Sequence, residues 1–158
     1  MFIEVSNQEK EAVYAFCKAI GEEGLKMSFA DVDHMDEVVQ WIENPREHLF
    51  AHMEAGRVIA LVKARQGETY KSHSVFMSAA VAKEHRGKRL VQDLSDWVYP
   101  QLKDRGIVLA RAYVYSDNHS SIAAALRDGY RCTGAVHMHH FDQEAGAWVD
   151  DMIFHKEL

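Results

Sequence analysis

The chain has 158 residues, of which 47% are hydrophobic and 27% charged, and its formal net charge is -6. This length and balance indicate one globular domain over 1–158 and exclude disordered and fibrous classes. The acidic balance argues against nucleic acid as a partner, and no segment has the pattern of a signal peptide or a membrane span. We therefore expect a cytoplasmic protein in which Cys17 and Cys132 are free thiols.

The first third of the chain predicts one strand and two helices. Residues 2–5 are short, apolar and β-prone. Ser6 and Glu9 have the spacing of a capping box, and the apolar residues that follow recur at helical spacing up to Gly21. A second helical pattern runs from about residue 33 and ends before Pro45, because the residue preceding a proline avoids helical angles.

The rest of the chain predicts an alternation of strands and helices. Two strands joined by a turn at Ala55-Gly56 are followed by a buried strand, a helix, a strand, a short helix and a final pair of strands. The expected strands are the pair within 48–66, then 72–81, 107–115, 134–141 and 148–158. The expected helices of this part are 88–105 and 118–128. This order predicts a mixed α/β domain built around a central sheet.

The stretch AVAKEHRGKRLVQDLSDW, residues 80–97, joins a predicted strand to a predicted helix. Its loop holds four basic residues, Lys83, Arg86, Lys88 and Arg89, around the single Gly87. The free amides and the dipole of a helix start bind anions, and glycine lets the backbone approach a ligand closely. The stretch therefore predicts a phosphate or pyrophosphate site, although the sequence has neither of the usual glycine patterns for nucleoside triphosphates and dinucleotides.

Two segments together resemble the GNAT superfamily of acyl-CoA N-acyltransferases. VAKEHRGKRL is similar to that family's pyrophosphate loop, which reads Gln or Arg, two residues, Gly, one residue, then Gly or Ala. NHSSIAAALRDGY is similar to the following segment, where Asn begins a helix and a Gly-aromatic pair ends it. The resemblance covers about residues 48–158. Glu84 and Arg89 depart from the loop pattern at its first and last positions.

The resemblance implies a fold and a ligand. The fold is a mixed, mostly antiparallel sheet flanked by helices, with a splayed parallel strand pair at the CoA site. Acetyl-CoA would be the co-substrate, and the acceptor would be a primary amine, in our interpretation a small molecule. The amine would attack directly in a ternary complex, and no metal is expected. The implied CoA-binding residues are Ala79 and Val81 through their backbone, the loop amides of Arg86, Gly87, Lys88, Arg89 and Leu90, and Asn118 and Ser121.

The usual acid and base of the family are both absent. Ala125 stands where many relatives have a tyrosine acid, and Met77 stands where some have a glutamate base. Because an acid or base contributes about 10²–10⁴ in rate, transfer can still proceed by positioning and by polarising the carbonyl. Tyr115 and Ser116 are the candidate catalytic residues, with His73 as a further candidate for proton transfer. The absence also leaves open a non-catalytic acyl-CoA-binding regulatory module.

Two further features leave alternatives open. In a regular strand His137 and His139 share one face and could bind a metal with Asp150, Asp151 or His155, or simply line a wet hairpin or the acceptor cleft. The acidic segment 22–37 could attract a cationic acceptor through Glu22, Glu23, Asp31 and Asp33, or be a solvated surface. A homodimer through the last strands is an alternative to a monomer.

Overall fold

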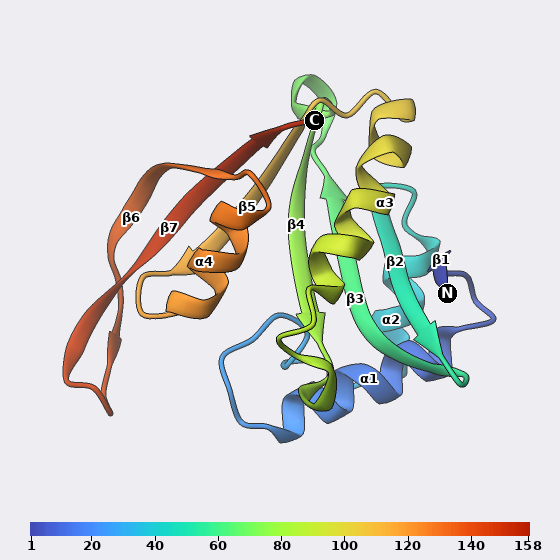
Figure 1. Ribbon diagram of the computed structural model, residues 1–158, viewed down its shortest axis with the longest axis horizontal. Helices are drawn as coiled ribbons and strands as arrows, with labels where there is room; N and C mark the ends of the chain where they lie inside the picture. The colour runs from blue at the N-terminus through green and yellow to red at the C-terminus, as the bar shows by residue number, and fades with distance from the viewer.

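The structure is a computed structural model that describes residues 1–158 (Figure 1). It contains seven strands, four α-helices and two single 3₁₀ turns. The strands are β1 (Phe2–Glu4), β2 (Glu47–Glu54), β3 (Arg57–Gln66), β4 (Ser74–Val81), β5 (Leu109–Tyr115), β6 (Arg131–Asp142) and β7 (Ala147–Glu157). The helices are α1 (Lys10–Glu22), α2 (Met35–Glu43), α3 (Leu90–Asp104) and α4 (His119–Arg127), and the 3₁₀ turns are η1 (Thr69–Lys71) and η2 (Lys83–His85).

The strands form one sheet in the order β1-β2-β3-β4-β5-β7-β6. Neighbouring strands are antiparallel except for β4 and β5, which are parallel. This parallel pair is short, because only Ser74–Phe76 of β4 pairs with Leu109–Arg111 of β5. Beyond these residues the two strands diverge, so that the sheet is split down its middle (Figure 1). The predicted mostly antiparallel sheet with a splayed parallel pair is confirmed.

Helices cover both faces of the sheet, and each face has its own core. On one face, α1 and α2 bury Val13, Ile20 and Val38 against Leu61. On the other face, α3 buries a second set, composed of Leu94, Val98 and Leu102 against Val62, Val75 and Met77. Burial of each such side chain contributes about 1.5–3 kcal/mol to the stability of the fold, so the helices on both faces are held against the sheet. None of the helices is both long and apolar enough to cross a bilayer.

The predicted helices are present, but α1 and α3 begin later than the sequence indicates for a physical reason. The Ser6 N–H donates to Glu9 Oε2 at 2.9 Å, yet this pair closes a turn ahead of α1, which begins at Lys10. Similarly, α3 begins at Leu90 rather than at Lys88. Gly87 and Arg89 have φ angles of 77° and 60°, and a right-handed helix does not contain such residues.

Candidate functional site

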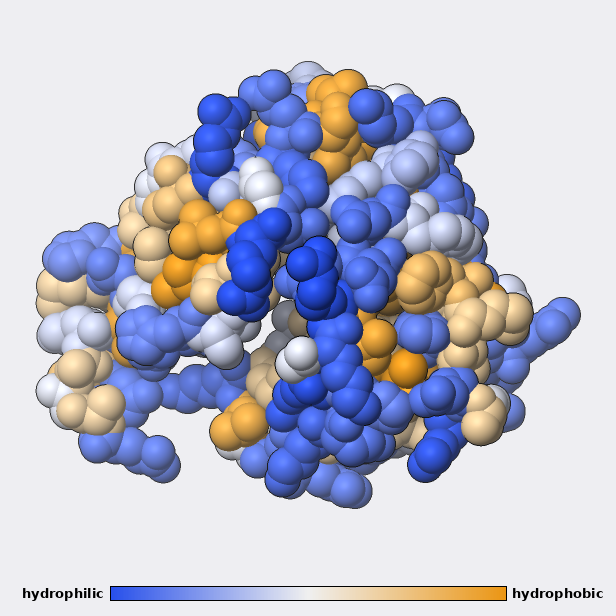
Figure 2. All heavy atoms as spheres, viewed as in Figure 1, coloured by the Kyte–Doolittle hydropathy of each residue, from blue (hydrophilic) through white to orange (hydrophobic).

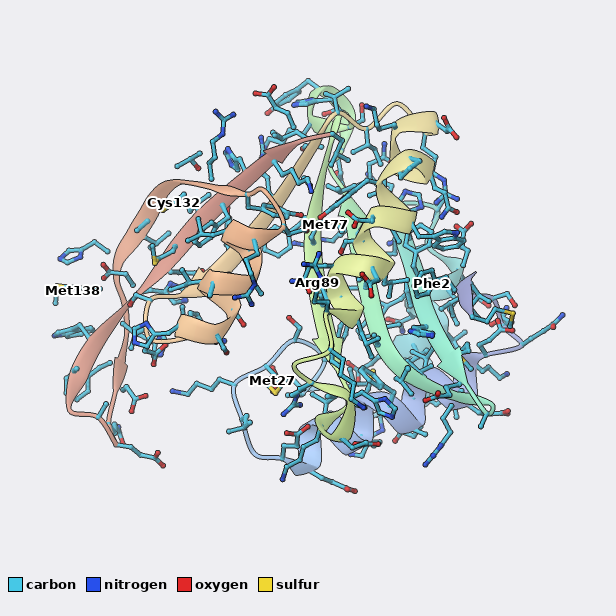
Figure 3. All side chains as sticks on the ribbon, viewed as in Figure 1. Phe2, Met27, Met77, Arg89, Cys132 and Met138 are labelled. Carbon is cyan, nitrogen blue, oxygen red and sulfur yellow. The ribbon has the colours of Figure 1, made fainter.

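A cleft of about 830 Å³ opens where β4 and β5 diverge. Figure 2 shows it as a hollow in the middle of the molecule. One wall consists of β4 and α3, and the opposite wall consists of β5, α4 and one residue of β7. The segment between α1 and α2 closes one rim with Leu25, Met27 and Ser28. Met27, Met77 and Arg89, which are far apart in the sequence, all lie around this opening (Figure 3).

The loop between β4 and α3 ends in a run of backbone amides without a partner in the protein. No hydrogen bond inside the protein uses the N–H groups of Gly87, Lys88, Arg89 and Leu90. The left-handed backbone at Gly87 and Arg89 belongs to the kind of turn in which successive amides converge on one anion. A Cβ atom added to Gly87 would meet nothing within 4 Å, so the protein itself leaves this position open. The loop has the backbone geometry of an anion site.

The Arg86 side chain is held by the protein itself. Its guanidinium donates to both carboxylate oxygens of Glu23, at 2.8 and 2.6 Å, and its Nε donates to Val81 O at 3.1 Å. The hydrogen bonds from Arg86 hold the pKa of the Glu23 carboxyl below its usual value. Arg86 therefore fastens the loop to the end of α1, whereas Lys88 and Arg89 are exposed.

The backbone of β4 presents its free edge to the cleft. Ala82 N–H donates to Ile59 O at 2.9 Å, so Ala82 faces β3. Because backbone groups alternate in direction along a strand, those of Ala79 and Val81 face the split in the sheet. Ala79 lines the cleft, and Val81 lies beside the loop, where its carbonyl meets Arg86.

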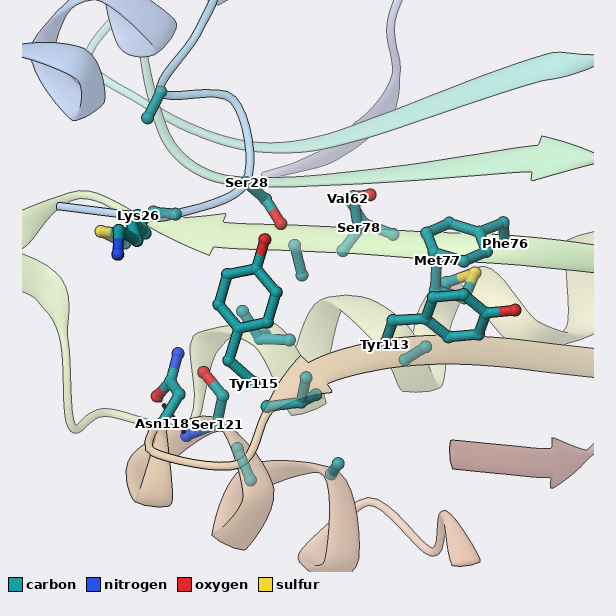
Figure 4. A pocket seen from close by; sticks show the side chains of 18 of the residues that line it. Lys26, Ser28, Val62, Phe76, Met77, Ser78, Tyr113, Tyr115, Asn118 and Ser121 are labelled. Carbon is teal, nitrogen blue, oxygen red and sulfur yellow. Dashed lines mark hydrogen bonds between the residues drawn. The ribbon is translucent and has the colours of Figure 1, made fainter. Parts of the chain in front are cut away.

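Asn118 and Ser121 meet at the start of α4. Asn118 Oδ1 accepts hydrogen bonds from the Ser121 N–H and from the Ser120 hydroxyl, both at 3.1 Å. Asn118 thus caps the helix as the sequence predicts. Both Asn118 and Ser121 line the cleft on the wall opposite β4 (Figure 4).

The two candidate catalytic residues lie in different environments. Tyr115 ends β5, lines the cleft and directs its hydroxyl across it toward Ser28 (Figure 4). Ser116 does not line the cleft. Its Oγ accepts a hydrogen bond from the Asp150 N–H at 3.0 Å, which fastens the end of β5 to β7. His73 precedes β4 at the closed end of the parallel strand pair.

The acidic segment contributes one carboxylate to the cleft. Asp31 lines it, whereas Glu22, Glu23 and Asp33 do not. Asp151, which the sequence analysis named only as a possible metal ligand, is a buried residue of β7 that lines the cleft wall. The sequence does carry a signal for it, because in WVDDMIF an aspartate occupies a position that alternates with Val149 and Ile153.

The histidines of β6 do not alternate regularly. Pairing between β6 and β7 passes from Val136 with Asp151 to His140 with Val149, so residues 137–139 form a bulge opposite Asp150. The expectation that His137 and His139 share a strand face is wrong here. His137 pairs with Asp150 at 3.1 Å, and His139 lies beside the Tyr115 ring instead. No three His, Cys, Asp or Glu side chains are grouped so that they could hold a metal ion.

A comparison of the sequence with known families gives a match over most of the chain. Residues 17–130 match the acetyltransferase (GNAT) family. The chain belongs to this family. Arg89, with its φ of 60°, has a left-handed backbone angle that glycine adopts more readily than arginine. Met77 is in the core against α3, and Ala125 lines the cleft.

Solved structures show the same GNAT fold at low sequence identity. An acetyltransferase of the GNAT family from Streptococcus pneumoniae is 13% identical, with a TM-score of 0.86 over 100% of this chain and 99% of that one. A ribosomal-protein-alanine N-acetyltransferase from Brucella melitensis is 19% identical, with a TM-score of 0.84 and the same coverage. A protein from Salmonella typhimurium assigned as an acetyltransferase, solved with its cofactor acetyl-CoA, is 17% identical, with a TM-score of 0.82 over 100% of this chain and 93% of that one. Among curated proteins, no sequence matches.

Proposed function

We propose that this protein transfers an acetyl group from acetyl-CoA to a primary amine of a small molecule, in a ternary complex. The observation that carries the proposal is the run of unpartnered amides from Gly87 to Leu90 at the start of α3, beside a split in the sheet. An amide cluster at a helix start suits a pyrophosphate, and the split suits a narrow chain that carries amide groups. Family membership favours acetyl-CoA, because this ligand combines a pyrophosphate with such a chain.

The donor would lie across the cleft from the loop to Tyr115. The pyrophosphate would be surrounded by the backbone amides of Arg86, Gly87, Lys88, Arg89 and Leu90. Of these five, only the Arg86 N–H has a partner in the protein, because it donates a long hydrogen bond to Lys83 O at 3.4 Å. The backbone groups of Ala79 and Val81 would pair with the pantetheine arm. An N–H at this edge, directed at the thioester oxygen, would stabilise the charge that develops there. Asn118 and Ser121 would bound the opposite side of the arm.

Transfer needs a proton for the departing sulfur. Tyr115 is the candidate, because its hydroxyl projects into the cleft from the end of β5. A thiol titrates near pH 8.5, so the sulfur is a tolerable leaving group and the acid has a modest task. Ser116 is a weaker candidate, since its Oγ is bonded to the Asp150 amide.

The first experiment is calorimetric titration with acetyl-CoA, for the wild type and for Gly87→Glu. The variant places a carboxylate among the loop amides, so we expect the wild type to bind and the variant to fail. Mass spectrometry of a panel of small amines incubated with the protein and acetyl-CoA then tests turnover. No binding by the wild type would overturn the proposal.

The alternative is a non-catalytic acyl-CoA-binding regulatory module. Met77 and Ala125, at the positions of the family's usual base and acid, favour it. Acetyl-CoA binding without product from any amine would support this alternative, whereas turnover that is lost in Gly87→Glu would exclude it. The single domain, the cytoplasmic location and the homodimer stay predictions.

A further inference from the structure

A buried carboxylate faces the cleft without a partner in the protein. Asp151 is 8% exposed, lines the cleft and accepts none of the side-chain hydrogen bonds that the protein makes. It is the register partner of Tyr115 on the neighbouring strand. Directly opposite residues of antiparallel strands project from the same face of the sheet, so Asp151 lies beside the proposed acid. Because Asp151 lines the cleft, a molecule that enters the cleft can donate a hydrogen bond to its carboxylate.

The neighbouring strand is distorted at the same place. In the bulge at 137–139, the Asp150 carboxylate accepts a hydrogen bond from the Met138 N–H at 2.8 Å, and Met138 has a φ of 49°. As a result both His139 and His140 approach the Tyr115 ring, with centroids at 5.8 and 4.7 Å. Adjacent residues of a regular strand would point to opposite faces. Bulges that re-aim side chains are frequent next to active sites.

Burial and the neighbouring histidines act on the pKa of Asp151 in opposite directions. Burial is the larger effect and raises the pKa of the Asp151 carboxyl, while the nearby His139 and His140 lower it. His140 Nε2 is itself buried without a partner. The charged groups on the other rim of the cleft are Asp31 and Lys26. A base works best when its pKa is drawn toward the working pH.

We propose that Asp151 is the general base, which takes a proton from the ammonium form of a cationic acceptor. This proposal rests on the proposed function and deepens it. The carboxylate attracts the ammonium into the cleft and then removes the proton that blocks the nitrogen lone pair. The acceptor class follows from this role: a primary amine that is protonated at neutral pH.

The step balances without any further reagent. Asp151 takes one proton from the ammonium, and the free lone pair forms the bond to the acetyl carbon. The carbon–sulfur bond then breaks, and its electron pair leaves on the sulfur, which receives a proton from the Tyr115 hydroxyl. The phenolate recovers a proton from the new amide nitrogen, and Asp151 releases its proton to the solvent beside the exposed His139. The products are the amide, the free thiol and one proton.

The test compares two acceptors in Asp151→Asn. One acceptor is an amine from the panel that is protonated at pH 7, and the other is its fluorinated analogue, whose amine is already neutral. Glu157→Gln is the control, because it neutralises a carboxylate on the same strand whose side chain is 81% exposed. Calorimetry with acetyl-CoA and thermal unfolding verify that each variant is folded, and Asp151→Glu, which keeps a carboxylate, provides a second variant.

The base role predicts a loss that depends on the acceptor. For the protonated amine we expect kcat of Asp151→Asn to fall by about 10²–10⁴, and for the neutral analogue by less than about 10-fold. Asp151→Glu should retain part of the activity, and Glu157→Gln all of it. An equal loss for both acceptors, or a rise in KM with kcat unchanged, would overturn the base role alone. If the wild type binds acetyl-CoA but acetylates no amine, the proposed function fails and the base role fails with it.

Discussion

Gly87→Ala should weaken acetyl-CoA binding far more than it weakens the fold. The φ of 77° puts the new side chain in the left-handed region, which costs about 1–2 kcal/mol, but no protein atom lies within 4 Å of the added Cβ. For a chain of this length the cost corresponds to a fall in Tm of about 2–8 °C. The methyl group would occupy the space beside the loop amides. Losing one charge-assisted hydrogen bond to a phosphate costs about 1.5–3 kcal/mol, and therefore raises Kd by about 10- to 150-fold.

The chain contains a matched control for this change. Gly106 follows α3 at its other end, has a φ of 80° and likewise has nothing within 4 Å of an added Cβ. Gly106→Ala should lower Tm by a similar amount and leave the acetyl-CoA Kd unchanged. Calorimetry gives the two Kd values, and differential scanning gives the two Tm values. Equal Kd values for Gly87→Ala and Gly106→Ala would refute the assignment of the loop amides to the pyrophosphate.

Three further changes test the rest of the site. Tyr115→Phe should lower kcat by about 10²–10⁴ and leave the acetyl-CoA Kd within about twofold, measured by steady-state kinetics and calorimetry; an unchanged kcat would remove Tyr115 as the acid. Asn118→Ala should destabilise the protein by about 1 kcal/mol in urea unfolding, because the Ser121 N–H loses its cap, and Asn118→Asp should recover most of that loss. Finally, folding raises the pKa of Asp151 above its unfolded value of 3.8. The contribution of Asp151 to the stability of the protein is therefore fully present below pH 3.8 and is lost as the pH rises through the folded pKa. Asp151→Asn should therefore melt higher than the wild type at pH 8, with the difference vanishing below pH 3.8; a lower Tm at pH 8 would contradict this sign.

Local signals in the sequence predicted most of the elements and much of the cleft. The Asn118 cap and the glycine loop at Gly87 depend on neighbours within a few residues, so their chemistry is legible in the sequence. The splayed strand pair came from the resemblance rather than from periodicity. Ala79 and Val81 also came from the resemblance, and the direction of their backbone groups follows from the Ala82 hydrogen bond to Ile59.

The features that the sequence did not predict depend on distant contacts. Arg86 reads as a free cation of the loop, but Glu23, 63 positions earlier, binds it. The bulge at 137–139 is stabilised by Asp150 on the next strand, and strand periodicity alone gives no indication of it. The sequence indicates Asp151 only as a possible metal ligand, and its place in the cleft depends on the pairing of β7 with β5.

The split in the sheet also has a consequence for solubility. Parting β4 from β5 leaves the backbone groups of a central strand without a ladder partner, and bare strand edges recruit other chains and seed aggregates. In this molecule the edge lies inside a cleft between two walls that β4, α3, β5 and α4 provide. A flat sheet of another molecule cannot lie against that edge, whereas a single slender chain can enter. The same walls that line the proposed ligand site thus keep the edge from pairing with a neighbour.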